Sequence, residues 1–243
     1  MEIIQNIIEY YDELYPVTEA QKKFYREQLR NYPDPAKLLR VGCGTGLFEH
    51  LLAREGKDVT GIESFQEMLR SANLRRRNQL MSIRFFQMSY LDMARFLGKG
   101  FYNLISILDD RIIFIHDKTL LRKFFFDCKQ LLAQDGCLII SLSNYRKFNR
   151  VPLFQLPQRK SLRVTLSTEI ASGDNGGFLL SQNIETGNGK ILPVVSKDRV
   201  CPVTDAEIRD FAGEAGFTEC EFYSSWEKEP FTGSEDTLIA LLR

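Results

Sequence analysis

The fold is decided by the stretch Leu38-Leu-Arg-Val-Gly-Cys-Gly-Thr-Gly46, in which a short apolar run ends in alternate glycines. The apolar run predicts a buried strand, and the helical spacing that resumes over residues 47–54 predicts a helix directly after the glycines. Alternate glycines at such a turn let the backbone approach a ligand closely, while the first amides of the helix point toward it. A strand, a glycine loop and a helix in this order open a parallel α/β sheet.

The alternation of strands and helices continues downstream of the glycine loop. We expect further strands over residues 59–63, 82–88, 103–109 and 137–143. Helices are expected between them, over residues 65–80, 91–96 and 118–132, and two short helices are expected before residue 32. Because these strands are almost continuously apolar, they need helices on both faces, which is the doubly wound arrangement.

The pattern changes after Ser143. Residues 144–158 are irregular, and polar and apolar residues then alternate over 161–170, 178–186 and 190–197, which predicts antiparallel strands. A capping-box sequence at Thr204 begins a last helix, and closing strands follow over 217–223 and 237–242. We therefore predict a Rossmann-like, seven-stranded, mostly parallel sheet with helices on both faces, formed by residues 1–147 and 201–243. An antiparallel β insert, residues 148–200, forms a lid between the fifth strand and the last helix.

Composition excludes several classes of protein. The 243 residues carry 32 basic and 32 acidic side chains, and this zero net charge argues against binding to nucleic acid or membrane surfaces through bulk electrostatics. No apolar run approaches the roughly 18 residues of a membrane span, and the N-terminus lacks a signal-peptide pattern, so a cytoplasmic location is expected. Five cysteines without a CxxC pair predict neither a disulfide framework nor a metal site. The basic run Arg75-Arg76-Arg77 is expected to be the solvated end of a helix.

An acid follows the glycine loop at the position where a ribose would be bound. Glu63 ends the second predicted strand, and an acid at the tip of the strand beside the glycine loop can accept hydrogen bonds from a ribose diol. The dinucleotide fingerprint GxGxxG would require a third glycine at Leu47. The spacing therefore disfavours a nicotinamide or flavin dinucleotide.

These stretches resemble the class I S-adenosylmethionine-dependent methyltransferases. Leu38–Gly46 is similar to their first motif, and Val59-Thr-Gly-Ile-Glu-Ser-Phe-Gln-Glu-Met-Leu69 is similar to their second. Phe101–Leu108, Leu131–Ile140 and the Ala215-Gly-Phe217 ending resemble the family's fourth strand, its fifth-strand segment and its reversed last strands. The antiparallel insert resembles the substrate cover of the small-molecule, glycine/sarcosine N-methyltransferase-like branch. The resemblance implies an S-adenosylmethionine-dependent methyltransferase with a small-molecule acceptor, and leaves the oligomeric state open.

The resemblance also implies a set of cofactor-binding residues. The glycine loop, through Gly42, Cys43, Gly44 and Gly46, would receive the methionine part of the cofactor, and Glu63 would bind the ribose hydroxyls. Ser64, Phe65 or Met68 would contact the adenine, with core packing as the alternative for Met68, and Ser89 would lie near the adenine amino group. Tyr90 and Leu108, at the ends of the third and fourth strands, are further candidates. Tyr11, with Tyr15, resembles the N-terminal tyrosines that close over the cofactor; aromatic packing of a docking helix is the alternative.

Three residues depart from the family pattern. Arg40 stands where the family generally has an acid, Asn103 replaces an Asp, and Ser89 replaces another acid. A cationic cofactor would then meet a less acidic pocket. The alternative function is therefore a catalytically silent relative that binds a nucleoside ligand or a protein partner.

No residue is decisively catalytic in the sequence. Asp109 and Asp110 follow the fourth predicted strand, where they would line the pocket or cap a helix, and His116 would be a solvated or packing residue. Phe148, Phe154 and Phe178 would line an acceptor pocket or form the core of the insert. Neither the methyl acceptor nor a general base can be identified from these patterns.

Overall fold

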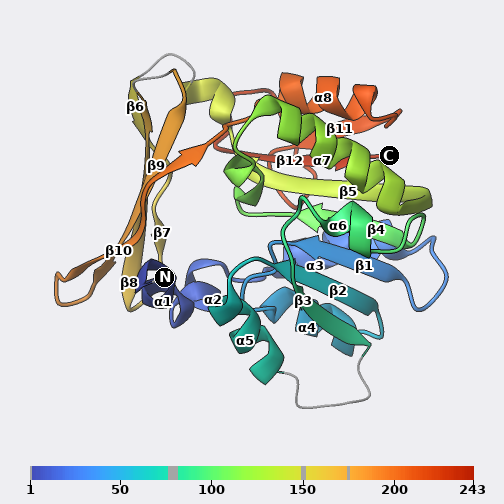
Figure 1. Ribbon diagram of the computed structural model, residues 1–243, viewed down its shortest axis with the longest axis horizontal. Coiled ribbons are helices and arrows are strands. Elements are labelled where there is room, and N and C mark those ends of the chain that lie inside the picture. Colours follow the sequence, from blue (N-terminus) through green and yellow to red (C-terminus); the bar gives the residue numbers. More distant parts are fainter. Residues whose placement is uncertain (1, 76–81, 149–151, 174–175) are drawn as a thin grey trace.

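The chain folds into two sheets that stand side by side. The computed structural model describes residues 2–75, 82–148, 152–173 and 176–243, and Figure 1 shows the smaller sheet beside one end of the larger one. The C-terminal end of the helix expected over 65–80, and Arg76 and Arg77 of the basic run, lie outside the described residues.

The larger sheet has seven strands in the order β11-β12-β5-β4-β1-β2-β3. Strands β1 to β5 pair in parallel, whereas β12 pairs antiparallel with both β5 and β11. Their bounds are β1 Lys37–Val41, β2 Asp58–Glu63, β3 Ile83–Gln87, β4 Tyr102–Ile107, β5 Leu132–Ser143, β11 Cys220–Tyr223 and β12 Thr237–Leu242. The predicted fold class is confirmed, and the strand order reverses between β1 and β4, where open α/β sheets bind ligands.

Helices cover both faces of this sheet, as the apolar strands require (Figure 1). Successive strand residues face opposite sides, so Leu38 packs with one cluster of buried side chains and Leu39 with another. Helices α3 (Glu19–Leu29) and α4 (Leu47–Arg54) belong to the first cluster. The second cluster contains α6 (Met93–Phe96), η1 (Arg111–Phe114), α7 (Lys118–Leu131) and α8 (Asp205–Glu214). Helix α5 (Gln66–Leu74) contacts β2 and β3.

Two short helices were expected at the N-terminus. The structure instead has α1 (Glu2–Ile8) and α2 (Tyr11–Leu14) before α3. A tight turn, in which the Tyr10 amide bonds the Ile7 carbonyl at 3.0 Å, separates the first two. The break redirects the chain, so that α1 packs against β10 of the smaller sheet and α2 reaches the glycine loop. Helical periodicity alone does not detect a break of this kind, since the apolar spacing continues across it.

The smaller sheet, here called the lid sheet, consists of β6 to β10. Its strands are β6 Leu153–Gln155, β7 Arg159–Lys160, β8 Val164–Ser172, β9 Phe178–Thr186 and β10 Ile191–Val200. All described pairings are antiparallel, in the order β10-β9-β8-β6, with β7 also paired to β8. The three longer strands match the predicted ones. The irregular stretch 144–158 was expected to contain no strand, but β6 lies within it; a strand this short carries no alternation, and only its partner β8 defines it.

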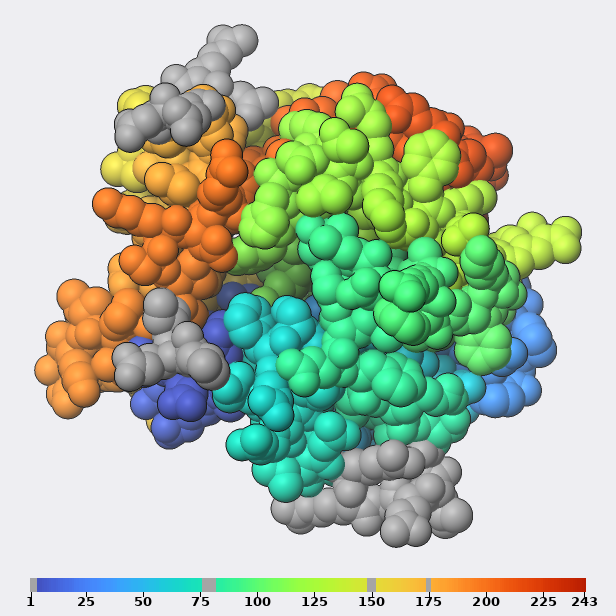
Figure 2. All heavy atoms as spheres, in the orientation of Figure 1, coloured from blue at the N-terminus to red at the C-terminus, as the bar shows by residue number. Residues whose placement is uncertain are grey.

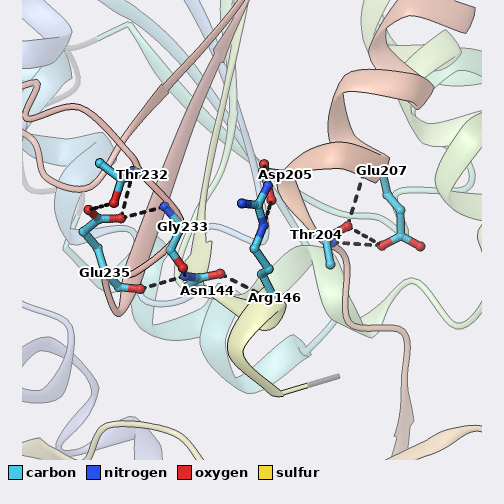
Figure 3. Close-up of polar contacts among 8 residues, drawn as sticks. All are labelled: Asn144, Arg146, Thr204, Asp205, Glu207, Thr232, Gly233 and Glu235. Carbon is cyan, nitrogen blue, oxygen red and sulfur yellow. Dashed lines mark hydrogen bonds and ion pairs between the residues drawn. The ribbon is translucent and has the colours of Figure 1, made fainter. Parts of the chain in front are cut away.

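The exit of β5 is fastened to the C-terminal loop (Figure 3). The buried Asn144 donates from Nδ2 to the carbonyls of Gly233 and Glu235 at 2.9 and 2.8 Å. Arg146 pairs with Asp205 at the start of α8 through two hydrogen bonds of 3.0 and 2.5 Å. The Asn144 contacts hold the end of β5 beside the segment that leads into β12, and the Arg146 pair holds the chain after β5 against the start of α8.

The capping box expected at Thr204 is present. Thr204 Oγ1 accepts a 3.3 Å hydrogen bond from the Glu207 amide, and Glu207 Oε2 accepts one of 2.9 Å from the Thr204 amide (Figure 3). Two amides that α8 leaves unpaired are thus satisfied by side chains.

Candidate functional site

A cavity of about 590 Å³ lies between the carboxyl ends of the sheet and the lid sheet. Figure 2 shows a hollow between the orange strands of the lid and the green and cyan elements of the larger sheet. The strands of the sheet contribute Val41, Ile62 and Ile107, and the lid contributes Thr168, Leu180, Gln182 and Val194. This size, and the mixture of apolar walls with a few polar groups, is typical of a small-molecule site.

The glycine loop forms one wall of the cavity at Gly42. Its φ is +70°, and a Cβ there would face the Arg111 side chain at 3.4 Å. Gly44, with φ +57°, lies directly under the Tyr11 ring, and a Cβ would come within 2.7 Å of it. A side chain at either position would be strained by the positive φ, and at Gly44 it would also displace the Tyr11 ring.

Glu63 ties the glycine loop to the tip of β2. Its side chain is buried, and Oε2 accepts a 2.9 Å hydrogen bond from the Gly44 amide. Oε1 accepts hydrogen bonds from the amides of Ser64 and Phe65 at 2.8 and 3.2 Å. A carboxylate has about four acceptor positions, two on each oxygen, and Oε2 uses one of its own for the loop. The other position on Oε2 suits a ligand hydroxyl.

Helix α2 is fastened across the loop by Asp12. Its Oδ1 accepts a 2.5 Å hydrogen bond from the Thr45 hydroxyl, and its Oδ2 contacts Arg75. Arg75 also donates from Nε to the Thr45 carbonyl at 3.0 Å. Arg75 stands at the end of α5, as expected, but its guanidinium is only 33% exposed because it joins α2 to the glycine loop.

Aromatic and basic side chains close the cavity above the loop. Tyr11 and Tyr15 stack with their ring centroids 4.7 Å apart, and burial raises the pKa of Tyr15 to about 12. Arg111 donates from Nη2 to the Tyr11 hydroxyl at 3.1 Å. Burial lowers the pKa of Arg111, but Tyr11 and Glu63 outweigh this and raise the pKa above its ordinary value. Both tyrosines are neutral hydrogen-bonding groups at neutral pH, and Arg111 is a fixed cation.

Arg40 lies beneath the loop as a buried cation. Its Nε is 3.8 Å from Glu49 Oε1, and its Nη2 is 3.6 Å from Asp109 Oδ2. Arg159, from β7 of the lid, approaches the other oxygen of Asp109 at 3.4 Å. These residues line a second, smaller cavity of about 230 Å³ beside the loop. The buried cation of Arg40 is thus balanced by two carboxylates.

Asp109 and Asp110 form a left-handed bend just after β4, with φ of +56° and +62°. Asp110 Oδ1 accepts hydrogen bonds from the Ser143 amide and the Tyr145 hydroxyl at 2.6 and 2.9 Å, and Oδ2 accepts one from the Ser143 hydroxyl at 3.0 Å. Burial raises the pKa of Asp110. Both acids line the larger cavity, and neither caps η1 with its side chain. Asp109 therefore belongs to the pocket, which was one of its two expected roles.

Most of the predicted site residues meet at one place. The larger cavity is lined by Tyr11, Gly42, Glu63, Ser64, Met68, Ser89 and Tyr90. Cys43 lines the smaller cavity. Gly46 packs under Phe85, whose ring would lie 2.7 Å from a Cβ, so Gly46 has a packing role.

Leu108 does not lie where it was expected. Its side chain is buried in the cluster on the α3 and α4 face and lines neither of the two cavities described above. The alternation of side chains explains this difference, because Ile107 and Asp109 on either side of Leu108 face the larger cavity.

The remaining residues that the sequence singled out lie at different places in the structure. Asn103 lies at the start of β4, where its Oδ1 accepts a 2.9 Å hydrogen bond from the Lys37 amide, so its amide stands far from the strand ends that form the cavity. Ser89 lines the cavity and its hydroxyl accepts from the Leu91 amide at 3.2 Å. His116 is an exposed residue at the rim. Phe154 and Phe178 pack in the core, and the side chain of Phe148 lies outside the described residues.

Sequence reasoning missed Asp12, Arg111 and the lid residue Arg159. Asp12 follows Tyr11 directly, so its position beside a predicted site residue was a usable signal. Arg159 lies in an irregular stretch without periodicity, and no pattern places it opposite Asp109.

Comparison with known proteins assigns the central part of the chain. Residues 38–136 match the family described as "Methyltransferase domain". The protein is thus a methyltransferase. The chain is 27% identical over 216 residues to "Putative methyltransferase GWCH70_2453" of Geobacillus sp. (strain WCH70). The aligned residues make up 87% of this chain and 86% of that protein.

Solved structures show the same fold over the whole methyltransferase. The CcbJ methyltransferase from Streptomyces caelestis superimposes with a TM-score of 0.77 at 15% identity, covering 100% of this chain and 96% of that one. CalS10, an amino pentose methyltransferase from Micromonospora echinaspora determined with bound S-adenosylmethionine, gives 0.66 at 22% identity and covers 98% and 97%. The enzyme class expected from the sequence is thus confirmed. Among the described residues, no helix is long and apolar enough to cross a membrane.

Proposed function

We propose that this methyltransferase uses S-adenosylmethionine and transfers its methyl group to a small molecule held under the lid sheet. The observation that carries the proposal is the link between the glycine loop and the tip of β2, in which Glu63 Oε2 accepts from the Gly44 amide at the wall of the larger cavity. An acid tied to the loop in this way presents its remaining acceptor position where a ribose would lie.

The residues present fit an adenosyl cofactor. Glu63 offers an acceptor for the ribose hydroxyls, Gly42 leaves the loop free of a side chain, and Phe65 and Met68 offer an apolar surface for the adenine. Ser64 and Ser89 supply hydroxyls beside that surface. When bound, the cofactor supplies an electrophilic methyl group, and this chain orients the acceptor toward it and excludes water. Such alignment is the main requirement of methyl transfer.

The lid sheet supports a small acceptor. The lid sheet forms a wall of the cavity through Thr168, Leu180, Gln182 and Val194, and Gln182 donates to Thr168 at 2.9 Å within that wall. Helix α1 and the lid strands share one apolar cluster, so a single packed wall closes the cavity. A space of about 590 Å³ is large enough for a cofactor and a compact acceptor, and is too small for a duplex or a folded protein segment.

Thermal unfolding tests the cofactor. A ligand at about 100 times its Kd stabilises the folded state by about 2.7 kcal/mol. In a chain of this length the midpoint should then rise by about 5 to 10 °C with S-adenosylmethionine or S-adenosylhomocysteine and remain unchanged with NAD. A shift with NAD alone would contradict the proposal.

A product assay tests the reaction and separates it from the silent alternative. Release of S-adenosylhomocysteine is measured with panels of small amines, alcohols, thiols and carboxylic acids, with DNA and a protein mixture as comparison acceptors. Turnover with one small-molecule panel is expected. Tight binding of the cofactor without turnover on any panel would instead favour a catalytically silent relative.

A further inference from the structure

A polar cross-strand pair interrupts the apolar inner face of the lid sheet. Every second residue of β8 is buried, and the row reads Val164, Leu166, Thr168 and Ile170. On β9 the residue opposite Thr168 is Gln182, which stands between the buried Leu180 and Ile184. Thr168 is only 7% exposed. Two apolar rows are therefore broken at the same level of the sheet by an uncharged polar pair.

The pair lies where the lid sheet borders the larger cavity. On one side of it, Leu166 and Ile184 belong to the apolar cluster that also holds residues of α1. On the other side, Ile170 and Leu180 belong to the cluster that contains α7 and α8. The pair stands between these two packed regions and lines the cavity. The polar side chains thus occur where the inner face meets the space for a ligand.

Stability does not explain the pair. Gln182 donates from Nε2 to Thr168 Oγ1 at 2.9 Å, and among the described residues neither side chain has another hydrogen-bond partner. Replacing both partners of such a bond by apolar groups of similar shape is nearly neutral or stabilising. Valine and leucine at these positions would also continue the apolar rows on either side. The reason for two polar groups at this point is then a ligand that uses them.

The pair has one free donor and one free acceptor beside the cavity. When the amide nitrogen donates to Oγ1, the Thr168 hydroxyl can donate onward and Gln182 Oε1 can accept. Turning the amide over exchanges the roles of the two residues and still leaves one donor and one acceptor. A carboxylate only accepts and an ammonium only donates, so each satisfies half of the pair. A hydroxyl or a carboxamide does both and satisfies the pair completely.

Arg111, Arg159 and Asp110 line the same cavity and already have partners within the chain. Arg159 approaches Asp109 at 3.4 Å. Arg111 donates to the Tyr11 hydroxyl at 3.1 Å. Asp110 accepts three hydrogen bonds from residues just after it in space, at the end of β5 and the turn beyond. A charged group on the acceptor would compete with these contacts, which favours an uncharged group.

We propose that Thr168 and Gln182 select the acceptor by binding an uncharged group that both donates and accepts a hydrogen bond. The group is a hydroxyl or a carboxamide on the part of the acceptor that faces the lid. This inference rests on the proposed function and adds the class of acceptor to it. An acceptor without such a group would leave polar atoms of the lid without partners, and its transition state would be bound less tightly.

Turnover on matched acceptors tests the selection. Linear acceptors of graded chain length carry the reactive group found in the product assay at one end. At the other end they carry a hydroxyl, a carboxamide, a carboxylate or a methyl group. The wild type should prefer the hydroxyl or the carboxamide member to the methyl member by about 10- to 100-fold in kcat/KM, and should disfavour the carboxylate. The better of the first two identifies the group that the pair binds.

The same assay separates two kinds of failure. Equal kcat/KM for the hydroxyl, carboxamide and methyl members would overturn the inference, and so would a preference for the carboxylate. Absence of turnover with every acceptor would contradict the proposed function itself.

Variants assign the preference to the pair. The double variant Thr168→Val with Gln182→Leu should reduce the preference over the methyl member to about twofold or less, whereas Thr168→Ser keeps the hydroxyl and should retain it. Thr165→Val is the matched control, since Thr165 lies on the other face of β8 and lines neither cavity described above. A preference that survives in the double variant, or is lost in Thr165→Val, would overturn the inference.

Urea unfolding of the double variant distinguishes selection from a structural role. Its midpoint should equal or exceed that of the wild type, because apolar residues replace both partners of the hydrogen bond. A lower midpoint, or a double variant that does not fold, would show that the pair holds the lid sheet together and would overturn the inference.

Discussion

Asp12 of α2 accepts a hydrogen bond of 2.5 Å from the hydroxyl of Thr45, the residue between the second and third glycines of the loop. The contact joins residues 33 positions apart in the sequence. It places the Tyr11 ring over Gly44 and makes the N-terminal segment a wall of the proposed cofactor site.

Replacing Asp12 by alanine should weaken binding of S-adenosylhomocysteine by about 1 to 2 kcal/mol, because α2 loses its hydrogen bond to the loop. Isothermal titration calorimetry measures this change. Glu13→Ala is the matched control, since Glu13 contacts Arg163 of the lid rather than the loop, and it should change the affinity less than about twofold. Equal effects of both substitutions would show that the Asp12 contact has no special part in binding.

Replacing Glu63 by glutamine should lower both ligand affinity and stability, each by about 1 to 3 kcal/mol. The amide group of glutamine would turn a donor toward the amides of Gly44 or of Ser64, which now donate to the carboxylate. Titration with S-adenosylhomocysteine and urea unfolding measure the two effects. Glu67→Gln, on the adjoining helix α5, serves as the control and should change neither. Unchanged affinity in Glu63→Gln would remove Glu63 from the ligand site.

Replacing Gly44 by alanine should abolish ligand binding and destabilise the fold by more than the left-handed φ alone explains. The φ of +57° costs about 1 to 2 kcal/mol for a residue with a Cβ. The contact with Tyr11 at 2.7 Å adds to this cost. Gly56→Ala has a similar φ of +83° and no atom within 4 Å of its Cβ, so the difference between the two variants measures the Tyr11 contact. A difference near zero would show that the ring yields freely.

Replacing Asp110 by asparagine should stabilise the protein at neutral pH. Burial raises the pKa of Asp110 in the folded state, so the folded state binds the proton more tightly than the unfolded state does. The free energy of unfolding of the wild type therefore falls as the pH rises above about 3.9, the ordinary pKa of aspartate. Asparagine removes this dependence and tolerates the left-handed φ of +62°.

Urea titrations from acidic to neutral pH measure the free energy of unfolding of the wild type and of Asp110→Asn. The advantage of Asp110→Asn should grow with pH and vanish at the acidic end. A wild type that is the more stable of the two at neutral pH would show that the ionised carboxylate gains more from Ser143 and Tyr145 than it loses by burial.

Replacing Thr204 by alanine should cost about 0.5 to 2 kcal/mol of stability, because α8 loses its N-terminal cap. Ligand affinity should not change, since the cap lies outside both cavities described above. Thermal unfolding and the same calorimetric titration measure the pair of effects. A parallel loss of affinity would indicate that α8 communicates with the site through Arg146 and Asp205.

Much of this site could be predicted because its residues are close in sequence to strand ends. Gly42 and Glu63 are fixed by the strands that precede them, and the carboxyl ends of parallel neighbours meet at one edge. Leu108 lies outside both cavities because strand alternation turns its side chain to the same face as Leu104, while Ile107 and Asp109 face the larger cavity. Asn103 was expected to make the cofactor pocket less acidic, but it lies at the start of β4, whereas the cavity lies at the other ends of the strands.

The sequence by itself determined the seven-stranded fold, the glycine loop, the acid opposite it and the position of the lid, because periodicity and turn residues encode local structure. Only the tertiary structure decided which distant groups meet. In the sequence Arg40 is a cation at a position where an acid was expected. In the fold the carboxylates of Glu49 and Asp109 balance its charge. Arg159 reaches Asp109 only because the lid sheet folds back over the strand ends. Pairings of this kind depend on the path of the whole chain, which no local pattern records.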